Sequence, residues 1–185
     1  MSLAETDFQG ENILISAAFD HEEVGSHTEI GAAGPLLEQV LRRCARATGE
    51  VEAFERMLAA SSCLSADVAH SVNPNYPEKH DPDTRPVMGA GPVLKLNASQ
   101  RYATDAQGWH IWEDAAGRCG VKTQCFVSNN AVTCGSTIAP MTATRLGITT
   151  IDVGVPILSM HAAREICALG DQVEMAKIMQ SYLQK

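Results

Sequence analysis

The stretch SCLSA, residues 62–66, leads directly into Asp67 and has the small and apolar residues of a strand that ends at a carboxylate. A second stretch, TTIDV at residues 149–153, is rich in β-branched residues and is followed by a loop that carries His161. In parallel sheets, reactive side chains lie in loops just past the carboxyl ends of strands. The two stretches therefore predict a sheet with a carboxylate and an imidazole at one edge.

Strand and helix patterns alternate along the rest of the chain. Short apolar runs predict further strands at residues 12–19, 93–96 and 121–127. Amphipathic stretches predict helices at residues 36–44, 51–60, 105–117, 134–146 and from residue 170 onward. This alternation is typical of an α/β fold with a largely parallel sheet covered by helices on both faces. Turn residues between 68 and 85 predict a long loop, and long loops in compact domains are usually functional.

The composition excludes several classes of protein. The chain has 185 residues, of which 45% are hydrophobic and 19% charged, which excludes a disordered or collagen-like chain. The net charge of -8, without a run of Lys or Arg, argues against nucleic acid or an anionic membrane as partner. No segment approaches 18 consecutive apolar residues, and residues 1–10 are acidic and polar rather than a signal pattern. We therefore expect a soluble, cytoplasmic protein.

The six cysteines form no C-x-x-C pair and have no regular spacing, which argues against a zinc ribbon or a disulfide framework. We expect them to be reduced and mostly buried. Glu22 and Glu23, Asp67 and His161 each lie just past a predicted strand. Carboxylates and imidazoles gathered at one sheet edge form the ligand set of a zinc or manganese hydrolase. The alternative for each residue alone is structural: a solvated turn, a turn aspartate or a buried histidine.

The sequence around these positions resembles the aspartyl and vacuolar aminopeptidases, a family of dinuclear zinc metallopeptidases. The resemblance rests on seven segments: FDHEEVGS at residues 19–26, SADVAHSVNPNY at 65–76, GPVLKLN at 91–97, QRYAT at 100–104, CGSTI at 134–138, DVG at 152–154 and MHAARE at 160–165. In order and spacing they cover nearly the whole chain from residue 12 onward. The resemblance implies the three-layer α/β/α fold of the zinc aminopeptidases, incomplete at its N-terminus.

The resemblance also implies a role for each site residue. Glu22 would be the general base, Glu23 and His161 would hold one zinc ion, and Asp67 would hold the other. A complete active site would contain two zinc ions, with manganese or cobalt as substitutes. The positions that would line the substrate are Glu22, Asp67, His70, Lys95, Tyr102 and His161.

The substrate implied is a peptide with a free N-terminal Asp or Glu. Lys95 could pair with the acidic side chain, and Tyr102 or His70 could donate to the oxyanion. The chain departs from the family at residues 129–133 (NNAVT), where members usually have Arg-Asn-Asp-x-Pro, and at Asn73, where many have histidine. An aminopeptidase for neutral N-terminal residues therefore stays open as an alternative.

Residues 1–185 would correspond to the C-terminal portion of the catalytic domain. Family members carry a further histidine and a bridging aspartate upstream, with a dimerisation domain between them, and residues 1–11 contain no histidine. Each missing ligand weakens metal binding, so we expect weak or no peptidase activity from this chain alone. The alternative is an inactive remnant or an assembly piece. The resemblance also implies a homo-oligomer in the full-length form.

Overall fold

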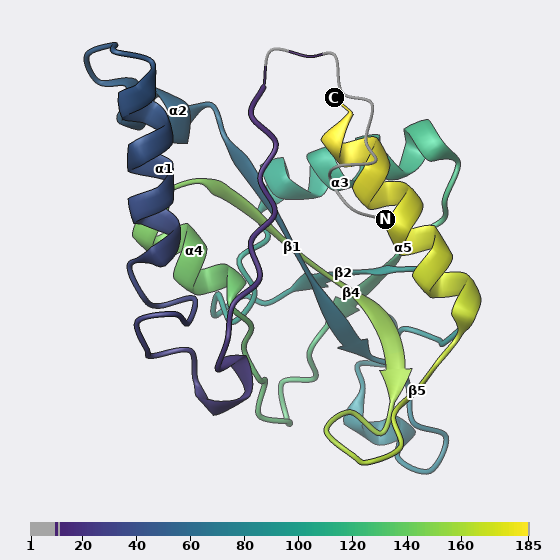
Figure 1. The fold of residues 1–185 in the computed structure, drawn as a ribbon. Helices are drawn as coiled ribbons and strands as arrows, with labels where there is room; N and C mark the ends of the chain where they lie inside the picture. Colours follow the sequence, from purple (N-terminus) through teal and green to yellow (C-terminus); the bar gives the residue numbers. More distant parts are fainter. Residues whose placement is uncertain (1–9, 11, 185) are drawn as a thin grey trace.

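Five strands form one mixed sheet in the computed structural model, which describes residues 10 and 12–184 (Figure 1). They pair in the order β1-β4-β2-β3, and β5 pairs with β4 beside this path. Pairing is parallel between β1 and β4 and between β2 and β3, but antiparallel between β2 and β4 and between β4 and β5. The strands are β1 (Ser62–His70), β2 (Val93–Leu96), β3 (Gln124–Val127), β4 (Thr149–Leu158) and β5 (Ile166–Cys167).

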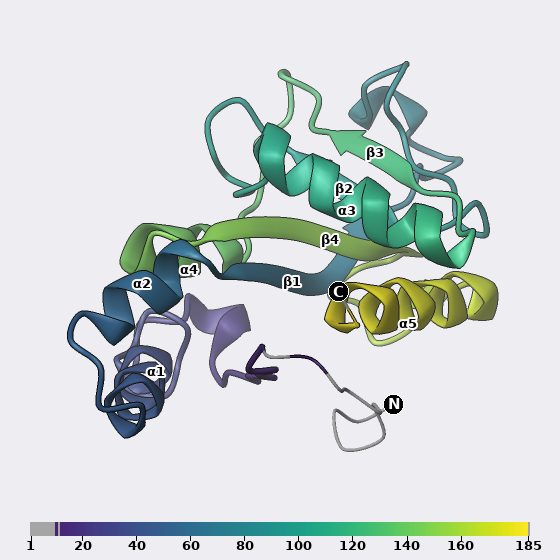
Figure 2. The same cartoon turned by 90° about the horizontal axis from the view of Figure 1, so that it is seen from above.

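Helices flank the sheet, in agreement with the predicted α/β class. Figures 1 and 2 show α1 and α2 together at one end of the molecule and α5 at the other, and α3 packs against both α5 and β4. The helices are α1 (Leu36–Ala47), α2 (Ala53–Ala59), α3 (Ala106–Cys119), α4 (Ala139–Leu146) and α5 (Leu169–Leu183), with short 3-10 helices η2 (Glu22–Val24) and η3 (Pro77–Lys79). None of the helices in the described part of the chain is long and apolar enough to cross a membrane.

Alternate residues of β4 separate the core from the polar side of the sheet. Ile151 and Val153 belong to the main hydrophobic core, to which α3 contributes Trp112 and α5 contributes Ile178. Side chains alternate between the two faces of a strand, so Asp152 points to the face opposite this core. A smaller buried cluster consists of Ala69, Val93, Tyr102 and Phe126. The sheet therefore has an apolar face against α3 and α5 and a face that carries polar groups.

Local signals explain the boundaries of α3. Asp105 precedes its first residue, and the Asp105 carboxylate accepts a hydrogen bond from the Gly108 N–H at 2.8 Å. Gly120 ends the helix with φ 68°, a left-handed conformation that glycine adopts without steric cost. These are the usual chemical signals for the start and end of a helix. The predicted helix at residues 105–117 therefore agrees with α3 to within two residues at each end.

The strand predicted at residues 12–19 is wrong. The segment is not paired with any described strand, and Ile13 and Ile15 are 59% and 41% exposed. Figure 1 shows it as an extended stretch that passes in front of β1 without joining the sheet. An apolar run expresses a preference for burial, but a strand also needs a neighbour for its backbone hydrogen bonds. Residues 1–9, 11 and 185 lie outside the described residues.

Four further predictions need correction. The sheet is mixed rather than largely parallel, because the alternation of elements does not fix strand direction. The strand predicted at 62–66 continues to His70, because β1 pairs with β4 along its full length, so Asp67 lies within the strand. The helix predicted from residue 134 begins at Ala139. Of the six cysteines, all free, five are only partly buried and Cys167 is exposed.

Candidate metal centre and substrate cavity

One cavity of about 390 Å³ brings all the predicted site residues together. They come from η2, from β1 and β2, and from the loops that follow β2 and β4. Segments far apart in the sequence therefore meet at the polar side of the sheet, and not only past the ends of strands, because Asp67 lies within β1. The predicted residues in its wall are Glu22, Glu23, Asp67, His70, Lys95, Tyr102 and His161.

The glutamate pair lies in a tight turn instead of at the end of a strand. His21 (φ 64°) and Gly25 (φ 101°) flank η2 in left-handed conformations, and the Ser26 N–H closes the turn onto the His21 carbonyl oxygen at 2.8 Å. The ring Nδ1 of His21 lies 2.9 Å from Thr28 Oγ1. Left-handed conformations of residues other than glycine concentrate at functional sites, because surrounding contacts must hold them. The left-handed backbone of His21 is therefore consistent with a functional role of this turn.

Glu23 and His161 already lie within hydrogen-bonding distance of each other. The His161 Nε2 atom is 3.1 Å from Glu23 Oε2, and their side chains are 67% and 72% exposed. The backbone of His161 is also left-handed (φ 66°), and its N–H donates to Glu165 Oε1 at 2.6 Å. An imidazole nitrogen and a carboxylate oxygen that face one another are a typical start of a zinc site.

The buried ammonium group of Lys95 lies between two carboxylates in the wall of the cavity and beneath it. Lys95 is 2% exposed, and its Nζ atom lies 3.1 Å from Asp67 Oδ2 and 3.8 Å from Asp152 Oδ1. Asp152 is fully buried, and its other oxygen accepts hydrogen bonds from Thr137 Oγ1 at 2.7 Å and from the Ala103 N–H at 3.3 Å. A buried charge needs a partner, and here one cation serves two carboxylates.

β1 comes unusually close to β4 beside this network. Asp67 is in register with Gly154, where an added Cβ atom would lie 2.6 Å from the Val68 carbonyl carbon. Only glycine permits this approach of the two backbones. The glycine therefore contributes to the position of Asp67 above Lys95.

Burial changes the proton affinity of several groups in the wall. Burial, followed by the negative charges of Glu23 and Asp67, raises the pKa of Glu22 above its usual value. Burial also lowers the pKa of His70, with a smaller contribution from His80. Burial and a hydrogen bond with Cys134 raise the pKa of Tyr102, so the phenol keeps its proton and remains a hydrogen-bond donor.

The donors present suit zinc in their chemistry, although they do not form a complete site. Carboxylates and imidazoles are zinc ligands, and Glu23 and His161 provide one of each at close range. Asp67 contacts Lys95 instead of the other donors. Within the described part of the chain, no three His, Cys, Asp or Glu side chains come close enough together to hold a metal ion. The residues thus fit as one part of a metal centre.

Asp152, Thr137 and Glu165 were not predicted as site residues. Thr137 and Glu165 line the cavity, and Asp152 lies directly beneath Lys95. Asp152 had a detectable signal, because a carboxylate in the middle of a β-branched strand must find a partner when it is buried. Glu165 is four residues after His161, and only the loop geometry reveals their contact.

Comparison with known proteins defines the family. The sequence model of one protein family, the aminopeptidase I zinc metalloproteases (M18), matches residues 1–183 of this chain. A protein of Streptomyces avermitilis, named as a probable M18 family aminopeptidase 2, is 48% identical over 184 residues, which cover 99% of this chain and 43% of that protein. The chain therefore belongs to the M18 family of zinc aminopeptidases.

Solved structures of the family have the same fold. An M18 aminopeptidase from Thermotoga maritima matches with a TM-score of 0.82 and 29% identity, over 90% of this chain and 39% of that one. The aminopeptidase 1 dodecamer of Saccharomyces cerevisiae matches with a TM-score of 0.79 and 37% identity, over 89% and 36%. In each of these comparisons the chain spans about two fifths of the relative's length or slightly less.

Proposed function

We propose that this chain supplies part of the active site of a dinuclear zinc aminopeptidase that removes N-terminal Asp or Glu from peptides. The observation that supports the proposal is the single cavity in which the glutamate pair, Asp67 and His161 meet Lys95 and Tyr102. Glu23 and His161 would hold one zinc ion and Asp67 the other. Membership of a family described as zinc metalloproteases supports the choice of metal.

Each residue of the cavity has a chemical task in this proposal. Bound zinc would lower the pKa of water and polarise the substrate carbonyl. The Glu22 carboxylate takes the proton of the attacking water and returns it to the leaving amine. Tyr102 or His70 donates a hydrogen bond to the oxyanion, a task for which the protonated phenol of Tyr102 is suited.

Lys95 is the residue that would bind the acidic side chain of the substrate. Its ammonium is the only cationic side chain among the described residues that line this cavity, apart from the histidines. It is also already paired with Asp67 and Asp152, which favours the alternative of a neutral N-terminal residue. To distinguish a preference for acidic N-terminal residues from one for neutral residues, the substrates must differ only in the side chain of the N-terminal residue.

The absence of a third grouped ligand among the described residues supports a second candidate, an inactive remnant or assembly piece. We also propose a homo-oligomer. The support for it is that one structural relative is a dodecamer. A stable fold that binds no zinc would agree with the remnant.

Zinc affinity, measured by competition with a chromogenic chelator, tests the metal assignment. We expect weak binding by the 185-residue chain, and a further loss of about tenfold or more in Glu23→Gln and His161→Asn, because each variant removes one ligand. Glu50→Gln is the matched control, since Glu50 lies in an exposed ion pair with Arg56. Equal affinity in wild type and Glu23→Gln would contradict the assignment.

Hydrolysis of Asp- and Leu-p-nitroanilide with added zinc tests the reaction. Faster turnover of the Asp substrate would support the leading proposal, and faster turnover of the Leu substrate the neutral alternative. Zinc binding without turnover of either agrees both with a chain that supplies part of an active site and with the inactive remnant.

A further inference from the structure

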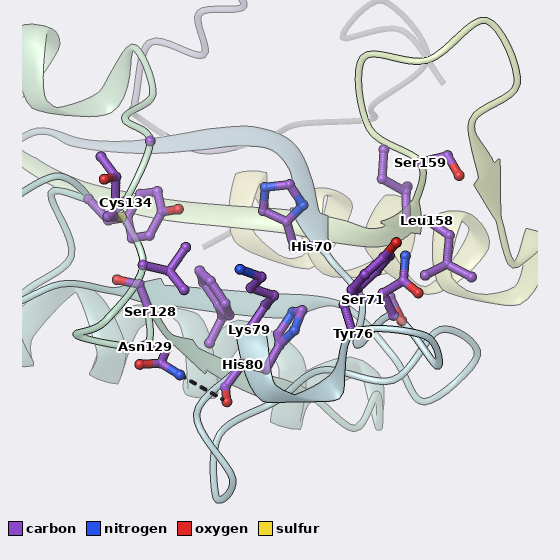
Figure 3. A pocket seen from close by; sticks show the side chains of 17 residues that line it. His70, Ser71, Tyr76, Lys79, His80, Ser128, Asn129, Cys134, Leu158 and Ser159 are labelled. Atoms are coloured by element: carbon purple, nitrogen blue, oxygen red, sulfur yellow. Dashed lines mark hydrogen bonds between the residues drawn. The ribbon is translucent and has the colours of Figure 1, made fainter.

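A second cavity, of about 400 Å³, borders the site cavity. The two cavities share four wall residues, which are His70, Tyr102, Phe126 and Gly135. His70 and Tyr102 therefore present one side to the glutamates and Asp67 and another to the second cavity. Figure 3 shows the second cavity from close by, with side chains from several loops around one space.

The second cavity differs chemically from the first. The side chains that line it include the apolar residues Phe126, Ile157 and Val132 but no carboxylate, whereas the site cavity contains Glu22, Glu23, Asp67 and Glu165. Lys79 is its cationic side chain, and His70 and His80 are its imidazoles; Figure 3 shows all three around the same space. A concave pocket with apolar side chains in its wall can bury an apolar side chain of a ligand.

The wall of the second cavity is held in place by hydrogen bonds. The amide of Asn129 donates to the carbonyl oxygens of Glu78 at 3.1 Å and His80 at 3.4 Å (Figure 3 draws the second of these). His80 also pairs with Ser128 in a β-bridge. Asn73 and residues 129–133, where the chain departs from the usual family sequence, meet around this cavity through Asn73, Asn129, Val132 and Thr133.

We propose that this cavity binds the side chain of the second substrate residue, directly after the scissile bond, and prefers a bulky apolar one. The inference rests on the proposed peptidase function. Lys95, which would bind the first side chain, lies in the site cavity and not in this one, so the second cavity is free for the next residue. Phe126 and Ile157, both buried, give an apolar surface, while Lys79 disfavours a cationic side chain.

Binding of N-acetyl amides of phenylalanine, alanine and lysine to the 185-residue chain without added metal tests this inference. NMR titration measures the affinities. We expect the phenylalanine amide to bind about tenfold or more tightly than the alanine amide, because the cavity buries a ring in place of a methyl group. The lysine amide is expected to bind no better than the alanine amide. Equal affinities for phenylalanine and alanine would overturn the inference.

Variants that fill the cavity locate the binding. Val132→Trp and Thr133→Trp are each expected to weaken binding of the phenylalanine amide by about tenfold, because the indole occupies the space of the ligand. Val132 is 37% exposed, so its replacement does not open the core. Val51→Trp, at an 86% exposed valine in the turn between α1 and α2, is the matched control and should not change the affinity. Unchanged binding in both cavity variants would overturn the inference.

Two further measurements separate this inference from the proposed function. Zinc affinity that is the same in wild type and Glu23→Gln, together with selective binding of the phenylalanine amide, would contradict the peptidase proposal but not the inference about the ligand of the second cavity. Hydrolysis of Asp-Phe and Asp-Ala peptides at the same kcat/KM would overturn the inference alone. Sedimentation tests a second copy as occupant, and a wild-type oligomer that Val132→Trp dissociates would overturn the inference.

Discussion

The half of the molecule around β4 and the half formed by residues 12–60 differ sharply in packing. Ile151 and Val153 in β4 and Ile178 in α5 are fully buried. In the other half, Ile13 is 59% exposed and Val51 is 86% exposed, and α2 has no buried residue. Residues 12–60 also bury some apolar side chains, such as Leu41 and Ala45 of α1, but the main hydrophobic core lies around β4.

The candidate site joins these two halves. Glu22 and Glu23 come from the loosely covered half, whereas Asp67, Lys95 and Tyr102 are anchored in or beside the sheet. Rigid elements hold functional groups more precisely than loops do. Asp67, Lys95 and Tyr102 therefore have their support within the described chain, while the glutamate turn is held by its own hydrogen bonds and by the contact of Glu23 with His161.

Removal of Trp112 should have the largest effect on stability. Trp112 is 1% exposed in the main core, and Trp112→Ala is expected to lower the free energy of unfolding by about 3–5 kcal/mol. The control is Trp109→Ala on the same helix, where the side chain is 41% exposed and the loss should be much smaller. Urea denaturation followed by circular dichroism measures both. Similar losses would mean that α3 does not pack as described.

Cysteine reactivity should show the next largest difference. Burial, with the negative charge of Asp152, raises the pKa of Cys63 from 9.0 to about 11. Because the thiolate is the nucleophile and its fraction falls as the pKa rises, alkylation at pH 8 should be about a hundredfold slower than for an unperturbed thiol. Peptide mapping after iodoacetamide treatment measures the rate, with the urea-unfolded chain as control. Equal rates in the folded and unfolded chain would contradict the burial.

Loss of the cap at the start of α3 should have a moderate effect. Asp105→Ala removes the acceptor of the Gly108 N–H and is expected to cost about 1 kcal/mol of stability. Asp105→Asn keeps a side-chain oxygen in the same place and should retain most of the stability. Thermal unfolding of the three proteins compares them. An equal loss in both variants would indicate that the carboxylate charge matters more than the hydrogen bond.

A polar substitution at Ile13 should have the smallest effect. Ile13 is more than half exposed, so Ile13→Ser is expected to change stability by less than about 0.5 kcal/mol. Ile178→Ser, at a fully buried position, is the contrasting variant and should be severely destabilising. A loss above about 1 kcal/mol at Ile13 would show that residues 12–19 are covered in solution.

Much of the fold and the site could be predicted from local sequence. Asp105 marks the start of α3 and Gly120 its end, through chemistry that needs no tertiary contact. Residues 93–96 were correctly predicted as a strand. The glutamate pair, Asp67 and His161 were singled out by residue type and by their place after apolar runs. The catalytic and metal-binding roles of these residues remain predictions.

Contacts between these groups depend on the tertiary structure. Residues 12–19 have the composition of a strand but lie unpaired, because pairing depends on a neighbour that composition does not specify. The contacts of Lys95 with Asp67 and Asp152 join three strands, and the contact of Glu23 with His161 joins η2 to the loop after β4. Sequence determines the chemistry that each residue can offer and its local conformation. Long-range packing sets the distances between residues, because these depend on how the elements come together.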